Sequence, residues 1–372
     1  MNSRRNVLVS GASFAGLATA FWMKRLGYDV TVVEIAEGLK RGGTPVNIRG
    51  NTIDIVKRMG LFEQIKSNRL HMESTELVNS DGVAERSDRE NEDIDQPADE
   101  EYEIERDVLL NLMFDAVKDD VEFVFGDSMA SLKEKKDGID VSFTKMARRS
   151  FNLVFGCDGI HSTTRMHWFG AEKEFSHFLE AYGSVSIVDK LLIRENTSQV
   201  FNEPGKAVML SAYNNKTDII LIFYSENEIS YDYRDEEQKR SIIIEQFSRV
   251  GWRTQEILQE VKQSDNFYFD VLSQIKMPSW TKGRVALVGD AAYCASPAAG
   301  MGGSLAIDGA VALVDAFEKC GGDNELAFQE YNESFRPFIE QAQADAVSFG
   351  IAFLVPRTAE AIRKQSGRAP SS

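Results

Sequence analysis

The sequence has few cysteines and histidines, and this scarcity excludes several classes of protein. Its three cysteines, Cys157, Cys294 and Cys320, form neither a paired disulfide framework nor a metal-ligand spacing. The four histidines are scattered without a ligand pattern, so we expect no metal site. This cysteine usage fits a reducing compartment, and we expect a cytoplasmic protein.

Long apolar runs and an excess of basic charge are also missing. No stretch approaches the roughly 18 apolar residues of a membrane-spanning helix, and the apolar N-terminal run leads straight into a glycine turn, unlike a signal peptide. The chain has 58 acidic against 42 basic residues, a formal net charge of −16. We therefore expect no membrane and no nucleic acid among the partners. With 372 residues, 43% of them hydrophobic, the chain is long enough for two domains with a real core.

A glycine-rich turn near the N-terminus links an apolar strand, Asn6–Ser10, to a helical segment, Leu17–Leu26. Asp29–Val33 then gives a second strand, which ends at Glu34. This order is that of a dinucleotide-binding βαβ unit, in which the pyrophosphate lies at the helix N-terminus. The acidic residue at the end of the second strand is at the right distance to bind the adenosine ribose.

The turn itself, Gly11-Ala-Ser-Phe-Ala-Gly16, departs from the usual fingerprint at one position. Gly11 permits the tight turn, and Gly16 permits close packing of the helix on the strand. The middle position is Ser13 instead of glycine, and serine is small enough to keep the backbone close to a ligand. The turn alone is weak evidence, but the flanking strands and Glu34 favour a dinucleotide site.

A second glycine-rich stretch, Gly289–Gly303, follows a short apolar run that predicts a buried strand. Asp290 would lie at the carboxyl end of that strand, where open α/β sheets bind ligands. The glycines of Gly300–Gly303 let a ligand approach bare backbone, and the helix predicted at Ser304–Phe317 turns its positive end toward that ligand. This combination suits a flavin, while a polar loop of an ordinary α/β domain is the alternative.

Three further stretches stay open from the residues alone. Arg41–Gly50, with three glycines and two arginines, is either a loop beside a flavin or reductant or a plain surface loop. Arg106, at the start of a helix, is either a cofactor contact or a surface charge. Asp158, at an Asp-Gly turn after an apolar strand, could serve the cofactor or the reductant. In the same stretch, Ser162 could cap the next helix and Arg165 could tether the loop.

From about residue 177 to 276 the pattern changes to β-like runs, with one helix expected at Glu237–Val250. The expected strands are Ser184–Val188, Val208–Ala212, Ile219–Tyr224 and Phe267–Val271. They alternate apolar and polar residues, which predicts a mostly antiparallel sheet inserted in the nucleotide-binding domain. A sheet of this kind commonly forms one wall of a substrate pocket.

Smaller predictions concern the periphery. Asn51–Ile65 has the spacing of a single amphipathic helix, and the charged run Ala84–Glu105 is expected to be a solvated loop or peripheral hairpin. Val121–Phe125 and Asp140–Phe143 alternate like edge or hairpin strands around a turn. Residues 319–372 are expected to form packing helices that close the domain.

The order and separation of Gly11-x-Ser13-x-x-Gly16, Asp158-Gly159 and Gly289-Asp290 resemble the FAD-dependent aromatic hydroxylases. These are the single-component class A flavin monooxygenases of the para-hydroxybenzoate hydroxylase type. The resemblance covers nearly the whole chain, and the combination is far more specific than any one motif.

Within that family, the tetracycline-inactivating group is the most similar in several stretches. These are Gly42–Gly50, Phe267–Asp270 through Ser279–Arg284, and Ala291–Pro297. Because these stretches build the cofactor site, they inform the substrate only weakly. Met301 and Tyr293 replace a glutamine and a histidine that the family usually has, and neither change removes a backbone donor.

The resemblance implies an α/β fold: a Rossmann-like FAD-binding domain, an inserted, mostly antiparallel β-sheet substrate domain, and C-terminal helices. The expected boundaries are 1–70, 101–175 and 276–318 for the FAD-binding domain, 71–100 and 176–275 for the substrate domain, and 319–372 for the C-terminal helices. The implied cofactor-binding residues are Gly11, Ser13, Ala15, Gly16, Glu34, Arg106, Asp158, Asp290, Pro297, Gly300 and Gly302. No catalytic acid or base is implied.

The resemblance further implies a role for each of these groups. Ser13 and Gly16 would lie at the pyrophosphate, Arg106 near the flavin's phosphate and ribityl side, Asp290 at the ribityl chain, and 297–302 under the isoalloxazine. NADPH or NADH would reduce FAD, and O2 would add at the flavin C4a to form a hydroperoxide. That species would transfer one oxygen atom to an aromatic or polycyclic phenolic or enol substrate, with a tetracycline as the most testable member.

Two other interpretations stay open. A nicotinamide-only Rossmann dehydrogenase fits if Gly289-Asp290 is a structural turn, and a non-catalytic flavin-binding protein fits if no aromatic ligand stimulates NAD(P)H oxidation. A flavin halogenase is disfavoured because no Trp-x-Trp-x-Ile-Pro stretch is present. With no second dinucleotide fingerprint, NAD(P)H would bind transiently in a groove of the one cofactor domain.

Overall fold

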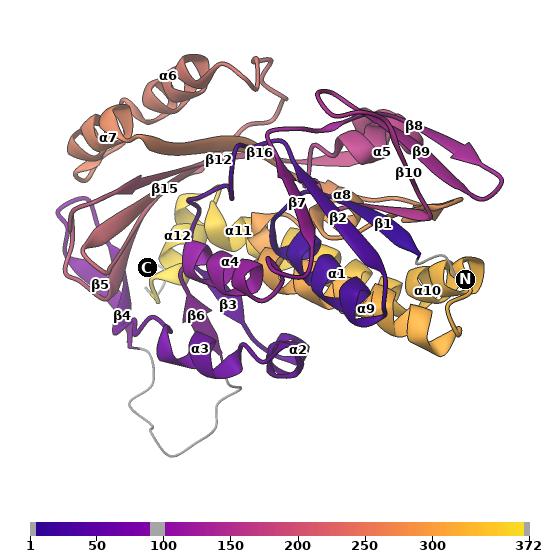
Figure 1. Ribbon diagram of the computed structural model, residues 1–372. Coiled ribbons are helices and arrows are strands. Elements are labelled where there is room, and N and C mark those ends of the chain that lie inside the picture. The colour runs from indigo at the N-terminus through magenta and orange to yellow at the C-terminus, as the bar shows by residue number, and fades with distance from the viewer. Residues whose placement is uncertain (1–4, 90–100, 368–372) are drawn as a thin grey trace.

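Two large sheets organise the structure, a computed structural model that describes residues 5–89 and 101–367 (Figure 1). In spatial order, the six-stranded sheet consists of β17 (Thr281–Lys282), β18 (Val285–Leu287), β11 (Leu153–Gly156), β1 (Asn6–Ser10), β2 (Asp29–Glu34) and β7 (Glu122–Phe125). All neighbours pair in parallel except β17 with β18. The central strands are almost wholly buried, which explains why they are continuous apolar runs without alternation.

The seven-stranded sheet is built from two separate parts of the chain. Its order is β16 (Asn266–Ile275), β12 (Ser176–Val188), β15 (Lys216–Tyr224), β14 (Lys206–Tyr213), β13 (Thr197–Glu203), β4 (Ser74–Val78) and β5 (Ala84–Arg89). Every pair is antiparallel except β13 with β4. The mixed α/β class, with an inserted and mostly antiparallel sheet, is confirmed.

Helices cover the sheets on defined faces (Figure 1). α1 (Phe14–Arg25) and α9 (Gly302–Lys319) pack against each other beside the six-stranded sheet. α6 (Glu236–Phe247) and α7 (Thr254–Gln263) cover the outer face of the seven-stranded sheet through an apolar cluster. The sequence predicted α6 and four of the strands, but it missed β13 and α7.

One local prediction is wrong, and another holds in a different arrangement. The single helix expected at residues 51–65 is two helices, α2 (Asn51–Met59) and α3 (Phe62–Ser67), because Gly60 adopts a left-handed φ of 77° and ends α2. The prediction of edge or hairpin strands holds for both segments separately, and only a pairing between them is wrong: β7 is the edge strand of the six-stranded sheet and pairs in parallel with β2. The hairpin is formed instead by β8 (Met129–Lys135) and β9 (Gly138–Phe143), and β10 (Arg149–Phe151) joins it.

The charged run at residues 84–105 contributes β5 and β6 (Tyr102–Ile104), which pairs with β3 (Val46–Ile48). β5 forms a hairpin with β4 at the edge of its sheet, which agrees with the expected peripheral hairpin and not with the solvated loop. Residues 90–100 of that prediction lie outside the described residues.

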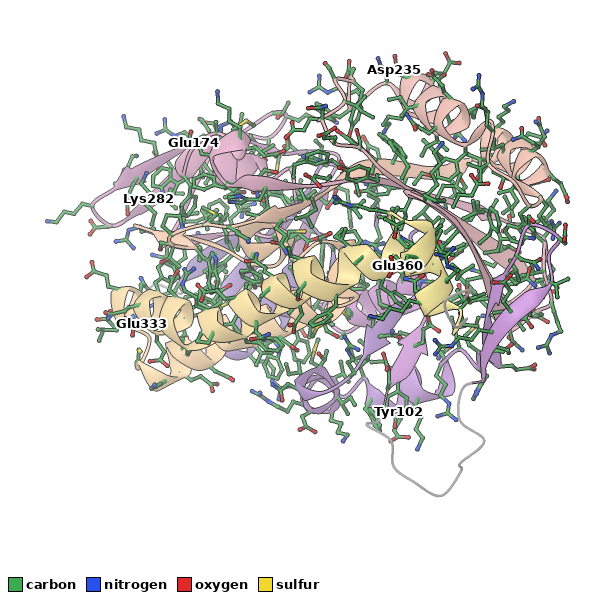
Figure 2. The ribbon with its side chains drawn as sticks, turned by 180° about the vertical axis from the view of Figure 1, so that it is seen from behind. Tyr102, Glu174, Asp235, Lys282, Glu333 and Glu360 are labelled. Carbon is green, nitrogen blue, oxygen red and sulfur yellow. The ribbon has the colours of Figure 1, made fainter. Side chains whose placement is uncertain are left out.

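The C-terminal helices form one long arm, which Figure 2 shows from behind between Glu333 and Glu360. It consists of α10 (Asn324–Asp345), a π-helical turn (Ala346–Gly350), α11 (Ile351–Leu354) and α12 (Ala359–Gln365). Gln343 donates to the backbone carbonyl groups of Ile275 and Cys294, which ties the arm to β16 and to the segment that follows β18. Among the helices of residues 5–89 and 101–367, none is by itself long and apolar enough to span a membrane; one bent pair, Asn324–Leu354 with Ala359–Gln365, is so by length and composition only.

Candidate functional site

The three turns that the sequence singles out follow three neighbouring parallel strands. The register pairs Ser10 of β1 with Gly156 of β11, and Gly156 with Leu287 of β18. Their carboxyl ends therefore meet at one edge of the sheet, which we call the cofactor edge. The first and third turns touch, because a Cβ added at Gly289 would lie 2.9 Å from the Cβ of Ala15.

In the first turn, both glycines are required by the packing of the protein itself. Gly11 has a φ of 103°, and a Cβ there would lie 2.4 Å from the carbonyl oxygen of Cys157. A Cβ on Gly16 would lie 1.9 Å from the carbonyl oxygen of Gly11. Ser13 is the N-cap of α1 but caps no amide with its side chain, and the first turn of α1 has no acidic residue. The amide groups there are free to bind an anion.

Arg106 lies beside this turn, at the start of α4 (Arg106–Asp115). Its Nη2 donates to Ser13 Oγ at 3.2 Å, and its Nη1 donates to the carbonyl groups of Lys40 and Gly42. Burial lowers the pKa of Arg106, and the charges of Asp107 and Asp290 oppose this shift. Arg106 is therefore not an ordinary surface charge.

The loop at residues 41–50 wraps around the same arginine. A Cβ on Gly43 would lie 2.8 Å from Cδ of Arg106, and the amide of Gly42 donates to the Asp107 carboxylate. The loop then enters β3, where the Asn47 carbonyl accepts from Ser304 Oγ of α9 at 2.8 Å. The loop thus belongs to the cofactor edge and is no detached surface loop.

Glu34 reaches the first turn from the end of β2. Its two carboxylate oxygens accept from the amides of Ala12, at 2.8 Å, and Ala36, at 3.0 Å. This places an acidic group beside the N-terminus of α1. Its contact with a ribose stays a prediction.

Asp290 begins a short helix, α8 (Asp290–Tyr293), directly after β18. Its side chain is accessible to water, yet protein surrounds it closely enough to raise its pKa by desolvation, while Cys294 and the charge of Arg106 oppose the shift. Water access combined with dense surroundings is what a side chain shows when it faces an internal space. Tyr293 points the other way: its hydroxyl lies 3.1 Å from that of Tyr331, in an aromatic cluster of the core.

In the second glycine turn, the glycines have room around them. Pro297, Gly300 and Gly302 are exposed, and a Cβ on Gly300 or Gly302 would meet no atom within 4 Å. Ser296, just before the turn, has a strained φ of 79°. α9 begins at Gly302 with no side-chain cap and no acidic residue in its first turn, so its amides also point at a space without a protein acceptor.

Asp158 is placed between the other two turns, and its carboxylate is used within the fold. It accepts from Thr163 and from both the amide and hydroxyl of Thr164, at the start of α5 (Thr163–Trp168). Ser162 caps this helix by accepting from the Arg165 amide, and Arg165 donates to the Ala291 carbonyl, so both of those expectations are confirmed. A contact of Asp158 with cofactor or reductant stays a prediction.

A charged cluster that was not predicted from the sequence joins the cofactor edge to the seven-stranded sheet. His161 contacts Asp270 at 3.0 Å and Glu172 at 2.9 Å, and hydrogen bonds to these two carboxylates raise its pKa to about 10. The Asp270 carboxylate also accepts from the Tyr268 hydroxyl at 2.8 Å. One signal was present, because Asp270 interrupts the apolar run of residues 267–272.

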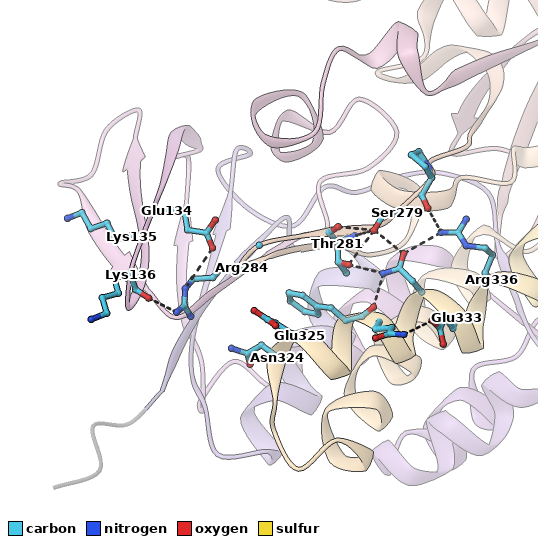
Figure 3. Close-up of a pocket in the computed structure, with 15 residues that line it drawn as sticks. Glu134, Lys135, Lys136, Ser279, Thr281, Arg284, Asn324, Glu325, Glu333 and Arg336 are labelled. Carbon is cyan, nitrogen blue, oxygen red and sulfur yellow. Dashed lines mark hydrogen bonds and ion pairs between the residues drawn. The ribbon is translucent and has the colours of Figure 1, made fainter.

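A hollow of about 830 Å³ lies elsewhere, between the β8–β9 hairpin, β17 and α10 (Figure 3). Its two arginines have protein partners: Arg284 lies 3.9 Å from Glu134, and Arg336 donates to the carbonyl groups of Met277 and Pro278. None of its lining residues belongs to the three turns. We therefore place the candidate site at the cofactor edge, despite the size of this hollow.

Comparison with known proteins agrees with this placement. Residues 4–345 match the family described as FAD binding domain. A flavin-dependent monooxygenase of Legionella longbeachae is 32% identical over 95% of this chain and 91% of its own length. The crystal structure of tetracycline destructase Tet(51) is 33% identical, with a TM-score of 0.87, over 98% of this chain and 95% of that one.

A more distant structure, Klebsiella pneumoniae HpxO complexed with FAD and uric acid, shares the fold with a TM-score of 0.74 at 19% identity, over 98% of this chain and 92% of that one. The family match spans the strands, turns and helices that form the cofactor edge. The chain belongs to the FAD-binding family of flavin-dependent monooxygenases.

Proposed function

We propose that this enzyme consumes NADPH or NADH and inserts one oxygen atom from O2 into an aromatic or polycyclic phenolic or enol substrate. The observation that carries the proposal is the cofactor edge. Two uncapped helix N-termini, one arginine and one inward-facing carboxylate surround a single region there. These are the groups that a dinucleotide with a redox-active ring requires.

The residues present fit FAD along its whole length. The amides of the first turn of α1, with Ser13 and Arg106, would bind the pyrophosphate, and Glu34 would bind the adenosine ribose. Asp290 would accept from the ribityl hydroxyl groups. The turn at 297–302 would lie under the isoalloxazine, where Gly302 leaves space for a flat ring. When bound, FAD supplies the redox and oxygen chemistry.

The protein would then do three things. The N-terminus of α9 would stabilise negative charge on the ring edge that faces it. Arg106, held by three hydrogen bonds, would fix the phosphate side without moving. The seven-stranded sheet and the C-terminal arm would cover the ring and exclude water from it. NAD(P)H would bind transiently, with Asp158 as a candidate contact.

The substrate is proposed from chemistry and from similarity. A tetracycline is the first compound to test, since Tet(51), a tetracycline destructase, is similar over almost the whole chain. The experiment is aerobic incubation of the FAD-loaded protein with NADPH and a tetracycline under isotopically labelled O2, followed by mass spectrometry. A product heavier by one labelled oxygen atom, dependent on NADPH and on protein, is the expected result.

Other outcomes separate the alternatives. Bound, reducible flavin with unchanged drug keeps the monooxygenase and moves the search to other phenols. If the protein binds flavin but no aromatic compound accelerates the reduction of that flavin by NAD(P)H, a non-catalytic flavin-binding protein is favoured. A protein that binds NAD(P)H but no flavin would overturn the proposal in favour of a dehydrogenase.

A further inference from the structure

The strand register places two rows of side chains across one face of the seven-stranded sheet. Residues paired across neighbouring strands point to the same face, and so do residues two apart on one strand. The first row, which we call the apolar row, consists of Tyr268, Val185, Ile220, Met209, Val200 and Leu77. The second, the polar row, consists of Asn266, Ile187, Asp218, Ser211, Ser198 and Thr75.

Both rows face the cofactor edge. The opposite face of the sheet is the one buried under α6 and α7, in a cluster that includes Tyr182 and Leu221. On the face of the rows, Lys216 of β15 forms an ion pair with Glu105, the residue before Arg106. At the β16 end, Asp270 meets His161. We call this side the inner face.

Other parts of the protein cover the two ends of the inner face and leave its middle uncovered. At one end, Ile351 and Val355 of the C-terminal arm pack on Ala207 and Ile222. At the other end, Glu105 accepts from Asn214 and Lys216.

In between, the middle of the apolar row is partly exposed. Val185, Ile220, Met209 and Val200 are half-buried. On β12, β15 and β14 the residues on either side of Val185, Ile220 and Met209 are buried.

The apolar row begins where the flavin is proposed to lie. Tyr268 is 45% exposed, and its pKa is raised first by desolvation and also by the nearby Asp270, Cys294 and Asp290. Lys40, whose carbonyl accepts from Arg106, has its Nζ 5.8 Å from the centre of the Tyr268 ring, so Tyr268 lies beside the cofactor edge. With strands spaced about 4.8 Å apart, β16 to β14 span about 14 Å, enough for several fused rings to lie along the row.

The composition of the rows restricts the charge of a ligand. None of their twelve residues is a lysine, arginine or histidine. On β5 the apolar row continues to Arg86, whose guanidinium donates to the Gln365 carbonyl. The polar row contains the fully buried Asp218, one of whose oxygens has no partner. The cations around the rows lie at their ends: Lys216 pairs with Glu105, His161 pairs with Asp270, and Lys40 Nζ lies 5.8 Å from the centre of the Tyr268 ring. A carboxylate over the middle of the rows would thus lose its hydration without gaining a counter-charge.

The polar row still offers neutral hydrogen bonds. The hydroxyls of Ser198 and Ser211 lie 3.0 Å apart and are both half-buried. One bond between them leaves one donor and several acceptor positions free, which suits hydroxyl and carbonyl groups.

We propose that the inner face binds a flat, fused-ring phenol or enol that carries no carboxylate. Its ring face lies on Val185, Ile220 and Met209, and its hydroxyl and carbonyl groups line the edge that faces Ser211. Met209 and Ile220 thereby set the specificity for uncharged over acidic aromatic compounds. This inference rests on the proposed function, because it takes the cofactor edge as the flavin site.

The test uses two anthraquinones that differ in one group. Chrysophanol has its hydroxyls and a carbonyl along one edge and a methyl group elsewhere, and rhein has a carboxylate in place of that methyl. Equilibrium dialysis against the FAD-loaded protein without NADPH measures binding apart from turnover. We expect chrysophanol to bind at least about tenfold more tightly than rhein. Equal binding, tighter binding of rhein, or no binding of chrysophanol would overturn the inference.

Substitutions then locate the site. Met209→Arg places a cation in the middle of the apolar row, so chrysophanol should lose and rhein should gain at least about tenfold in affinity. Gln199→Arg is the matched control: it adds the same charge one strand away, on the opposite face of the sheet, where Gln199 already contacts Glu76. This control should leave both affinities within about twofold of the unmodified protein.

Met209→Ala covers the case in which the arginine variant does not fold. It should weaken chrysophanol several-fold through lost contact area while leaving rhein weak. An affinity for chrysophanol unchanged by both substitutions would move the ligand off the inner face. If the unmodified protein did not bind FAD, by contrast, the proposed function itself would be contradicted.

Discussion

The two glycine-rich turns at the cofactor edge contain the same residue type for different reasons. In the first, a Cβ on Gly16 would lie 1.9 Å from the carbonyl oxygen of Gly11, so the protein alone demands glycine. In the second, a Cβ on Gly302 would meet nothing within 4 Å, and its φ lies outside the left-handed region. The protein does not explain that glycine, but a flat ligand packed against the turn does.

The same distinction separates two aspartates whose pKa values are raised. Asp218 is sealed under the inner face, where it accepts from the Tyr213 hydroxyl at 2.8 Å and desolvation raises its pKa to about 7. Asp290 faces the internal space of the cofactor edge. A feature enclosed by the protein should control stability, and one that faces open space should control ligand binding.

The strongest test of this distinction is Gly16→Ala. The new methyl group cannot fit beside the Gly11 carbonyl without separating α1 from β1, which should cost about 3 kcal/mol or more. Chemical denaturation of the protein without cofactor measures the loss. Gly38→Ala, at a position with no atom within 4 Å, is the control and should change stability by less than about 0.5 kcal/mol. A stable Gly16→Ala protein would show that the first turn is also shaped by its ligand.

Asp218→Asn should stabilise the protein, and more so as the pH rises. A folded-state pKa of about 7 against an ordinary value of 3.8 means that folding favours the protonated carboxyl. That stability is fully present below pH 3.8 and is lost as the pH rises through 7. The neutral amide, which still accepts from Tyr213, should gain about 2–4 kcal/mol at pH 8 and little near pH 4. Unfolding curves at both pH values check this, and a gain independent of pH would contradict it.

Sequence patterns found the local features and missed those created by distant contacts. The strand–turn–helix around Gly11, the cap at Ser162 and the aspartate after β18 each depend on neighbouring residues, and the structure has all three. The break at Gly60 was also local, and a glycine after an amphipathic run was the available signal.

The pairing of residues far apart in the chain could not be predicted in this way. His161 and Asp270 are 109 residues apart, and nothing near either residue indicates the other. The two rows of the inner face depend on the register of strands from two separate segments, which alternation alone does not fix. The sequence therefore predicted the cofactor side of the site better than the substrate side.

Gly302→Ala should separate stability from binding. Alanine fits the first turn of α9 and is a better helix former, so the cofactor-free protein should unfold within about 1 kcal/mol of the unmodified one. The affinity for FAD should fall about tenfold or more, because the methyl group occupies the space proposed for the ring. Fluorescence titration of FAD into the cofactor-free protein measures this. Unchanged affinity would place the isoalloxazine elsewhere.

The smallest expected effect is that of Asp290→Asn. This substitution should weaken FAD binding but stabilise the cofactor-free protein. The amide oxygen still accepts one hydrogen bond from a ribityl hydroxyl but loses the charge, so the affinity for FAD should fall about threefold to tenfold. Without cofactor, the variant should be more stable than the unmodified protein, and this difference should grow as the pH rises. The raised pKa of Asp290 means that its carboxylate costs folding free energy once ionised. Asp315→Asn, at an exposed ion pair with Arg58, should change neither quantity measurably. If Asp290→Asn lowered the stability of the cofactor-free protein, the carboxylate would have a partner within the fold, and Asp290 would serve the fold instead of the cofactor.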